Sequence, residues 1–273
     1  DGALASGPHV SPEINGYYLV TLPDGPPEEP PRLFDSTGQF IRVIGRHGEG
    51  PNEYRRPQHI HRINDSAWIH DAALHRITVI LPPDTTGPTR LWPLTPYALL
   101  PLPGESFVLS QGRWGSGPPL YHVDDAGAIL QNFGDTLPTG TRDWRWVHLA
   151  AAPDSGFWSA PPFWHLQFQY WRGPGRLERT MSLERDYFTE YTTYAQRSPT
   201  IPPDPSLSGF WADSTGALWI VVLVPDPEWP EGLGPEMRAE GRTIYPVEDW
   251  DRAYDTVIER VDSENGATLA SWR

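Results

Sequence analysis

The chain of 273 residues contains no cysteine and no lysine. Without cysteine it has no disulfide, no thiol nucleophile and no thiolate metal ligand. All 21 basic residues are arginine, and 35 acidic residues give a formal net charge of −14. Nucleic acids and anionic lipids bind proteins through basic patches that displace counterions. The charge balance therefore weighs against both as partners.

Long apolar runs are also missing. The longest run, Ala217–Val224, has the length of a strand, and no window reaches the roughly 18 apolar residues of a membrane-spanning helix. Turn formers are abundant instead, because 32 Pro and 25 Gly are spread among the short apolar runs. A turn at about every 8–12 residues is typical of an all-β chain.

Similar glycine-containing turns recur along the sequence. The first, Asp35–Gly38, lies between the β-rich runs Arg32–Phe34 and Gln39–Ile44 and predicts a hairpin. The others are Asp84–Gly87, Asp124–Gly127, Arg172–Gly175 and Asp262–Gly266. Successive turn glycines are 49, 40, 48 and 91 residues apart. A repeat of about 40–50 residues built of short strands is the blade period of a β-propeller.

A second set of hairpins lies between these turns. Its members are His59–Ile63 with Ala67–His70, Ala98–Leu102 with Ser106–Ser110, Val147–Ala151 with Phe157–Ala160, and Ser208–Ala212 with Ala217–Leu223. Asn15-Gly16 before Tyr17–Leu22 supplies the corresponding hairpin of the first unit. Two hairpins make one four-stranded blade, so five units are recognisable. The sequence predicts a single propeller domain over residues 1–273, with an inserted loop at 225–251.

One loop carries a resemblance to a known family. The run Ile44–Tyr54, IGRHGEGPNEY, is followed by the string Asp71–Val79, in which Arg76-Ile77-Thr78-Val79 ends the pattern. Over about residues 32–80 this resembles the bacterial six-bladed β-propeller families related to NHL repeats. The stretch FWADSTGALWIVV, ending at Val222, resembles the inner hairpin of the same families. The resemblance implies six blades and a periplasmic or otherwise extracytoplasmic location.

The glycine-rich loop itself does not predict a phosphate site. It lacks the G-K-[ST] ending and lies between strands, not before a helix. We expect a structural loop between blades, in which glycines permit positive φ and Glu53 accepts backbone N–H bonds. The residues concerned are Gly45, Gly48, Gly50, Pro51 and Glu53.

Three histidines are candidate metal ligands. His59 and His61 alternate along one strand and so face the same side, and alignment of the inner turns places His148 opposite His59. The equivalent positions of two other units are Ala98 and Gly209, so no ring of ligands forms. We favour solvent-facing or hydrogen-bonded histidines over a metal site, and we expect no cofactor.

Aromatic residues are numerous, with 13 Trp, 11 Tyr and 9 Phe. Much of this content is expected to pack between blades, including the side of the segment Trp164–Trp171 that carries Leu166, Phe168 and Tyr170. Tryptophans in or near loops are candidates for partner binding. These are Trp144, Trp146, Trp164, Trp171, Trp229 and Trp250. A sugar-stacking platform would use the same residues.

The insertion Pro225–Asp251 is too long for an ordinary connection within a blade. Its proline, glycine and acidic residues argue against an internal core, and Glu236–Glu240 has the composition of a short helical turn. Two interpretations are open, a solvated excursion or an arm that orders against a partner. We favour the arm.

Catalytic motifs are missing from the sequence, which has no G-x-S-x-G, no H-E-x-x-H and no EF-type calcium loop. The prediction is therefore a non-catalytic scaffold that binds other protein subunits at the extracytoplasmic face of a membrane complex. A photosynthetic reaction centre with its antenna is the specific hypothesis. The alternative is a lactonase-like or lyase-like enzyme, or a carbohydrate-binding protein, that uses the central channel mouth. Its site would be His59, His61 and His148 or the segment Trp164–Trp171.

Overall fold

The computed structural model of the chain describes residues 9–11, 13–21, 29–83, 85–111, 117–135, 147–163, 165–191, 202–229, 237–239, 242–244 and 253–273. The regular elements in these ranges are β-strands. Among the same residues, no helix is long and apolar enough to cross a membrane. The chain divides into two compact units. Unit 1 contains Asp1–Gly112 and Leu120–Asn132, and unit 2 contains Arg113–Pro119 and Phe133–Arg273.

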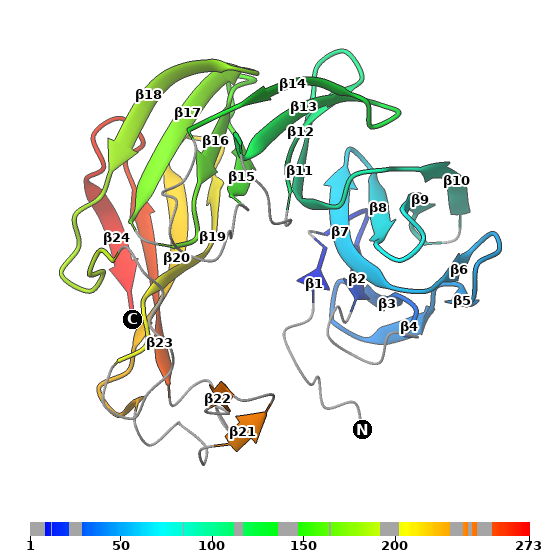
Figure 1. The fold of residues 1–273 in the computed structure, drawn as a ribbon, viewed down its shortest axis with the longest axis horizontal. Helices are drawn as coiled ribbons and strands as arrows, with labels where there is room; N and C mark the ends of the chain where they lie inside the picture. Colours follow the sequence, from blue (N-terminus) through cyan, green and yellow to red (C-terminus); the bar gives the residue numbers. More distant parts are fainter. Residues whose placement is uncertain are drawn as a thin grey trace. The chain divides into compact units, whose positions relative to one another are not determined.

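Unit 1 contains three four-stranded antiparallel sheets (Figure 1). The first sheet consists of β1 (His9–Val10), β2 (Tyr17–Thr21), β3 (Arg32–Asp35) and β4 (Phe40–Val43). The second consists of β7 (Pro57–Ile63), β8 (Ser66–Asp71), β9 (Arg76–Leu81) and β10 (Thr85–Leu91). The third consists of β11 (Pro96–Leu102), β12 (Ser106–Gln111), β13 (Leu120–Asp124) and β14 (Ile129–Phe133), whose last residue belongs to unit 2. The loop between the first two sheets contains the short parallel pair β5 (Arg46–His47) and β6 (Glu53–Tyr54).

Unit 2 contains two further sheets of the same kind. The fourth sheet consists of β15 (His148–Ala151), β16 (Phe157–Ala160), β17 (Gln167–Gly173) and β18 (Arg176–Ser182). The fifth consists of β19 (Ser206–Ala212), β20 (Leu218–Pro225), β23 (Tyr254–Val261) and β24 (Thr268–Trp272). Between β20 and β23 lies the two-stranded sheet of β21 (Met237–Ala239) and β22 (Arg242–Ile244).

Each four-stranded sheet is an antiparallel meander in which neighbouring strands follow one another along the chain, except that β21 and β22 are inserted between the neighbours β20 and β23. This is the architecture of a propeller blade. The prediction of an all-β propeller with four-stranded blades is confirmed, and the five sheets correspond to the five units recognised in the sequence. The residues that the structure describes form no sixth sheet of this kind.

Local turn chemistry accounts for most of the reversals. In the first hairpin Asp35 Oδ1 accepts hydrogen bonds from the backbone N–H groups of Thr37 (2.8 Å) and Gln39 (2.9 Å), while Gly38 has φ of 83°. Asn15 and Gly16 both have positive φ, as a tight hairpin of this type requires.

Two local predictions were wrong. The turn expected at Asp84–Gly87 begins earlier, because Thr85 to Gly87 already belong to β10. The consecutive prolines Pro82 and Pro83 follow β9, and proline ends a ladder because it has no N–H to donate. The helical turn expected at Glu236–Glu240 is also wrong, since Met237–Ala239 pairs as a strand with Arg242–Ile244.

The cores lie between the faces of neighbouring sheets within each unit. In unit 1 the strand β8 is buried on both sides. Ala67 and Ile69 pack with Leu19 of the first sheet, whereas Trp68 packs with Phe107 of the third. Alternation along a strand places successive side chains on opposite faces, which explains how one strand supplies two cores.

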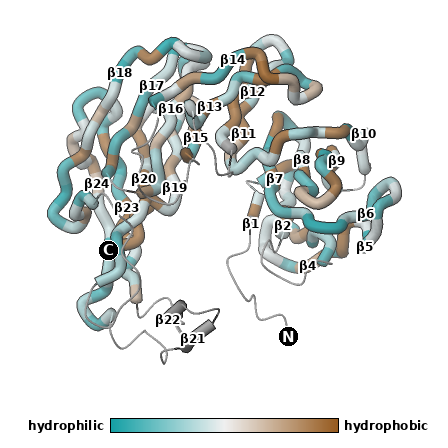
Figure 2. Tube along the Cα trace, viewed as in Figure 1, coloured by the Kyte–Doolittle hydropathy of each residue, from teal (hydrophilic) through white to brown (hydrophobic). Residues whose placement is uncertain are grey.

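In unit 2 the fourth and fifth sheets pack face to face. Leu218, Ile220 and Val222 of β20 are fully buried against residues such as Phe168 of β17. Figure 2 shows hydrophobic residues along β20. The alternate residues of β20 point to the other face of the fifth sheet, where Trp219 is only half-buried. The two faces of this sheet therefore differ in how completely they are covered.

Candidate functional site

The outer face of the fifth sheet carries a row of three tryptophans. Trp211 of β19 is the cross-strand neighbour of Trp219 of β20, and their rings are stacked with centroids 5.7 Å apart and planes 4° apart. Trp272 of β24 stacks on the other side of Trp219, with ring centroids 5.5 Å apart and ring planes 7° apart. Trp211 is 47% exposed and Trp272 is 50% exposed. These three residues are called the tryptophan face below.

A partly exposed hydrogen-bond network orients the middle ring of the tryptophan face. Oδ2 of Asp213 accepts hydrogen bonds from Nε1 of Trp219 (3.1 Å) and from Nε of Arg260 (2.9 Å). Its other oxygen accepts from the hydroxyl of Thr215 (2.6 Å). The Thr215 hydrogen bond, together with those from Trp219 and Arg260, lowers the pKa of Asp213 far below its ordinary value. The charged carboxylate thus holds an indole and a guanidinium in fixed positions.

These tryptophans were not among the predicted site residues, although the sequence contains a signal for them. The turn at Asp213–Gly216 pairs Ala212 with Leu218, and the same register pairs Trp211 with Trp219. Two large aromatic rings opposite one another on a strand pair interact directly. Counting the cross-strand pairs outward from this turn would have placed the indoles of Trp211 and Trp219 on the same face of the sheet.

The tryptophans proposed from the sequence have different environments. Trp171 is only 4% exposed, donates its Nε1–H to Ser159 Oγ (2.9 Å) and stacks on Phe157. It is therefore a core residue and is not accessible to a partner. Trp229 is half-buried just after β20, with its backbone N–H bonded to Asp226 O. Trp144, Trp146, Trp164 and Trp250 lie outside the described residues.

The remainder of the segment Trp164–Trp171 supplies core as well. Leu166, Phe168 and Tyr170 belong to the apolar cluster between the fourth and fifth sheets. On the alternate positions Gln167 and Gln169 are half-buried, and the Gln169 amide donates to Asp135 Oδ2 at 2.8 Å. The described part of this segment is thus occupied by packing within unit 2.

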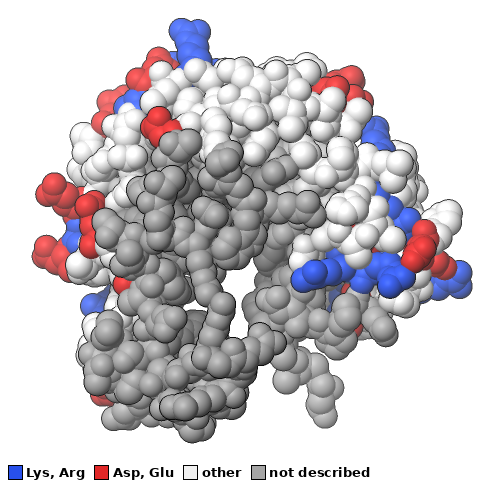
Figure 3. Space-filling view, viewed as in Figure 1, with Lys and Arg blue, Asp and Glu red and all other residues white. Residues whose placement is uncertain are grey.

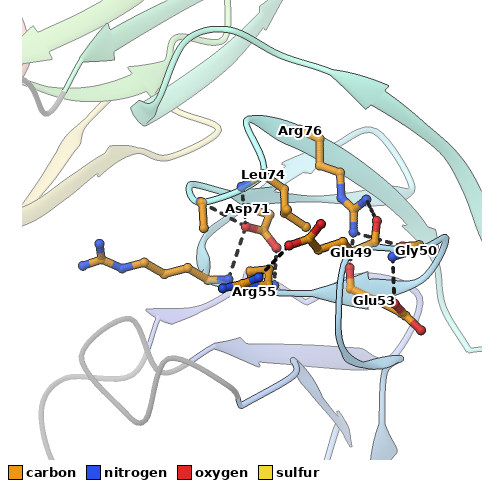
Figure 4. Close-up of polar contacts among 9 residues, drawn as sticks. Glu49, Gly50, Glu53, Arg55, Asp71, Leu74 and Arg76 are labelled. Carbon is orange, nitrogen blue, oxygen red and sulfur yellow. Dashed lines mark hydrogen bonds and ion pairs between the residues drawn. The ribbon is translucent and has the colours of Figure 1, made fainter.

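The glycine-rich loop is held by a dense set of hydrogen bonds (Figure 4). The guanidinium of Arg76 donates to three backbone carbonyls of the loop, those of Glu49, Gly50 and Glu53. The carboxylate of Asp71 accepts the backbone N–H of Arg55 at 2.7 Å. Both side chains come from the second sheet, so they tie the loop to that sheet.

The side chain of Glu53 links two other residues of the same loop to each other. Its Oε2 accepts the N–H of Gly50 at 2.7 Å, and its Oε1 pairs with the guanidinium of Arg46. The Gly50 N–H and Arg46 lower the pKa of Glu53. Gly45 and Gly48 have φ of 75° and 149°, and Pro51 is exposed. Figure 3 shows acidic and basic side chains next to one another on the flank of unit 1 that carries β5 and β6.

The candidate histidines belong to both units. In unit 1 the rings of His59 and His61 are stacked with centroids 6.2 Å apart, and His59 also contacts Tyr97. In unit 2 the Nε2 of His148 lies 3.0 Å from Leu207 O, and burial lowers the pKa of His148 to about 4. Among the described residues, no group of three or more His, Asp or Glu side chains could hold a metal ion.

A fourth histidine, His70, predicts a pH dependence of stability. It is fully buried in β8, and burial lowers the pKa of its imidazole from 6.5 to about 4. In the unfolded chain the ring takes up a proton below about pH 6.5, but in the folded chain only below about pH 4. We therefore expect His70 to contribute a fall of about 3 kcal/mol in the free energy of unfolding as the pH is lowered across this interval, in addition to the loss from the buried His148.

Urea unfolding at several pH values between 6.5 and 4 measures this loss. The variant His70→Gln should show a flatter dependence than the wild type, because it removes the titrating group. The exposed His47→Gln is the matched control and should keep the wild-type slope. An unchanged slope in His70→Gln would contradict the assignment.

The inserted loop contains the β21–β22 pair, in which Met237 is opposite Ile244. Its remaining described residues are Pro225 to Trp229. The arm that orders against a partner stays a prediction.

Comparison with known proteins supports the architecture. The family model DUF5128, described as a 6-bladed beta-propeller, matches residues 33–78. This segment runs from β3 through the glycine-rich loop into β9. No curated protein matches the chain.

Several solved structures are similar to the chain. A member of the DUF4221 family from Bacteroides vulgatus has a TM-score of 0.63 at 10% identity, over 97% of this chain and 80% of that one. A Bacteroides fragilis protein described as exported has a TM-score of 0.55 at 12% identity, over 97% of this chain and 70% of that one. A streptogramin B lyase has a TM-score of 0.53 at 10% identity, over 99% of this chain and 84% of that one. At these identities the likeness shows the fold alone, which is that of a β-propeller protein.

Proposed function

We propose that the chain is a non-catalytic interaction protein that binds another protein through the tryptophan face. The observation that carries this proposal is the exposure of Trp211 and Trp272, about half of each, in a parallel row with Trp219. Tryptophan is among the residues that contribute most to protein–protein binding energy. Exposed aromatic rings grouped on one sheet mark such a surface.

The tryptophan face is also ordered before binding. Its rings project from antiparallel strands, and the Asp213 carboxylate accepts a hydrogen bond that holds the indole of Trp219 in place. A surface that is rigid in the unbound protein loses less conformational entropy on association. Arg260, which is bonded to the same carboxylate and is the cross-strand neighbour of Trp219, adds a charged group on the adjacent strand. An apolar centre with charged residues nearby is the usual composition of an interface.

The partner in this proposal is a protein subunit of a membrane complex on the extracytoplasmic side. The net charge of −14 disfavours nucleic acid and anionic lipid. The likeness to a protein described as exported is in keeping with this location. A photosynthetic reaction centre with its antenna remains the specific hypothesis from the sequence. The channel-mouth enzyme or carbohydrate binder is the competing function.

Affinity capture tests the proposal. The wild-type protein and the double variant Trp211→Ala/Trp272→Ala are used to recover partners from solubilised membranes and from the soluble fraction of the source cells. Losing two such anchors should reduce recovery of a stoichiometric partner by about tenfold or more. The control variant is Leu91→Ala/Leu130→Ala, which removes two exposed apolar side chains from unit 1.

Equal recovery with the double variant and the wild type would overturn the proposal, as would recovery of a monomer alone. Urea unfolding of the same variants gives an independent measure. If the tryptophan face packs inside the protein, the double variant lowers the free energy of unfolding while capture stays unchanged. If the tryptophan face is a partner surface, the double variant reduces capture while the free energy of unfolding stays unchanged.

A further inference from the structure

A cavity of about 270 Å³ lies in unit 2, where the fourth and fifth sheets pack against each other. Its walls are the turns that follow β15, β19 and β23, together with three side chains of the fourth sheet, Trp158, Tyr170 and Arg179. The tryptophan face lies on the other side of the fifth sheet. None of the three tryptophans lines the cavity, although Thr215 belongs both to the cavity wall and to the hydrogen-bond network of Asp213.

Arg179 is the cation of this cavity. Cross-strand pairing aligns Trp158, Tyr170 and Arg179 in one row, and the guanidinium lies over the two rings at 5.1 and 5.3 Å. Its Nε is buried and has no hydrogen-bond partner among the described residues. Because this Nε is closed to solvent, a ligand in the cavity would contact the Nη end of the guanidinium, which carries the other N–H donors.

Several, though not all, of the other described arginines of unit 2 have carboxylate partners. Arg172 pairs with Asp154 and Glu178, Arg185 with Glu259, and Arg260 with Asp213. Arg179 has no such ion pair within the described part of the chain. A guanidinium presents a planar set of donors that matches the two oxygens of a carboxylate.

One carboxylate of the cavity wall, that of Asp154, is engaged by other groups. Asp154 accepts a hydrogen bond from the hydroxyl of Tyr170 at 2.6 Å and pairs with Arg172 at 3.0 Å. Burial and this hydrogen bond raise the pKa of Tyr170 to about 12, so the hydroxyl keeps its proton. Asp154 is thus engaged by Tyr170 and Arg172 and makes no ion pair with Arg179, whose guanidinium stays available to a ligand.

The opposite wall offers different chemistry. It is formed by Ser214, Ser263 and Glu264 from the turns of the fifth sheet. Glu264 is exposed, and its carboxylate accepts hydrogen bonds only. A ligand that spans the cavity therefore meets a cation on one side and acceptors on the other.

We propose that the cavity binds a small carboxylate that also carries hydroxyl or ammonium groups. The carboxylate lies on Arg179, and the donor groups lie on Glu264 and the serine hydroxyls. The volume is slightly below the roughly 300–1,000 Å³ of sites for drug-sized ligands. It suits a molecule of the size of a sugar acid or an amino acid.

Isothermal titration of the full chain tests this site with three probes, D-glucuronate, L-alanine and D-glucose. At least one of the two carboxylates should bind, and neutral D-glucose should not. The two carboxylates distinguish a hydroxyl-bearing ligand from an ammonium-bearing one. Arg179→Met should weaken binding by about tenfold or more, because it removes the charged donor but keeps an apolar stem.

Arg176→Met is the matched control, since this arginine is exposed on the same strand. It should bind like the wild type. Ser214→Ala, on the opposite wall, provides a second variant and should weaken binding less than Arg179→Met does. The proposal is overturned if neither carboxylate binds at millimolar concentration, if D-glucose binds equally well, or if Arg179→Met leaves the affinity unchanged. Circular dichroism of each variant shows that the fold is kept.

Discussion

Replacing Asp71 with alanine is expected to lower the free energy of unfolding by about 4 kcal/mol. The carboxylate is fully buried at the end of β8. It accepts backbone N–H bonds from Arg55 (2.7 Å), Arg56 (3.2 Å), Ala73 (3.1 Å) and Leu74 (3.1 Å). Alanine leaves these donors without their acceptor, and it removes one of the two side chains that tie the glycine-rich loop to the second sheet.

Asp35→Ala provides the control for this prediction. Asp35 makes the same kind of turn contacts, with Thr37 and Gln39, but at the surface of the first hairpin. Water can replace an exposed acceptor, so we expect a loss of about 1 kcal/mol or less. Urea unfolding of both variants measures the difference. Equal losses would show that the four N–H bonds of Asp71 are not the source of its effect.

Gly45→Ala is the second substitution with a large expected effect, a loss of about 4 kcal/mol of unfolding free energy. Gly45 has φ of 75°, which disfavours any residue with a Cβ. A Cβ there would also overlap the carbonyl oxygen of Asn52 and come within 2.8 Å of Cε2 of Tyr54. Both are held by β6 and its surroundings, and Tyr54 is buried, so neither can move cheaply.

Gly104→Ala separates the strain of a positive φ from the steric overlap of the new Cβ. Gly104 has φ of 85°, and no heavy atom lies within 4 Å of the position of its Cβ. Only the backbone strain remains there, with an expected loss of about 1–2 kcal/mol. Thermal or urea unfolding compares the two variants directly. If Gly104→Ala costs as much as Gly45→Ala, the close approach of Asn52 and Tyr54 contributes nothing.

The proposed partner surface and the proposed ligand site lie on opposite faces of the fifth sheet. The tryptophan face uses the exposed side of β19, β20 and β24, and the cavity lies toward the fourth sheet. Variants of Trp211 and Arg179 therefore test two functions independently. Loss of partner capture without loss of carboxylate binding, or the reverse, identifies which surface is used.

The features that the sequence determined by itself are local ones. Short apolar runs separated by turn residues were enough to predict an all-β propeller and to locate five blades, because hairpins depend on a few neighbouring residues. Asp35-Ser36-Thr37-Gly38 and Asn15-Gly16 specify their turns through side-chain hydrogen bonds and positive φ. The turn near Gly87 was misplaced because a proline pair ends β9 before the glycine is reached.

Only the tertiary structure decided which surfaces are exposed and which side chains meet. Alternation gives every strand two faces, but whether a face is buried depends on a neighbouring sheet that comes from distant sequence. Thus Trp171 is in the core while Trp211 is half exposed, although both lie in β-strands. The unmatched cation of Arg179 likewise arises from the packing of turns and strands that are far apart along the chain.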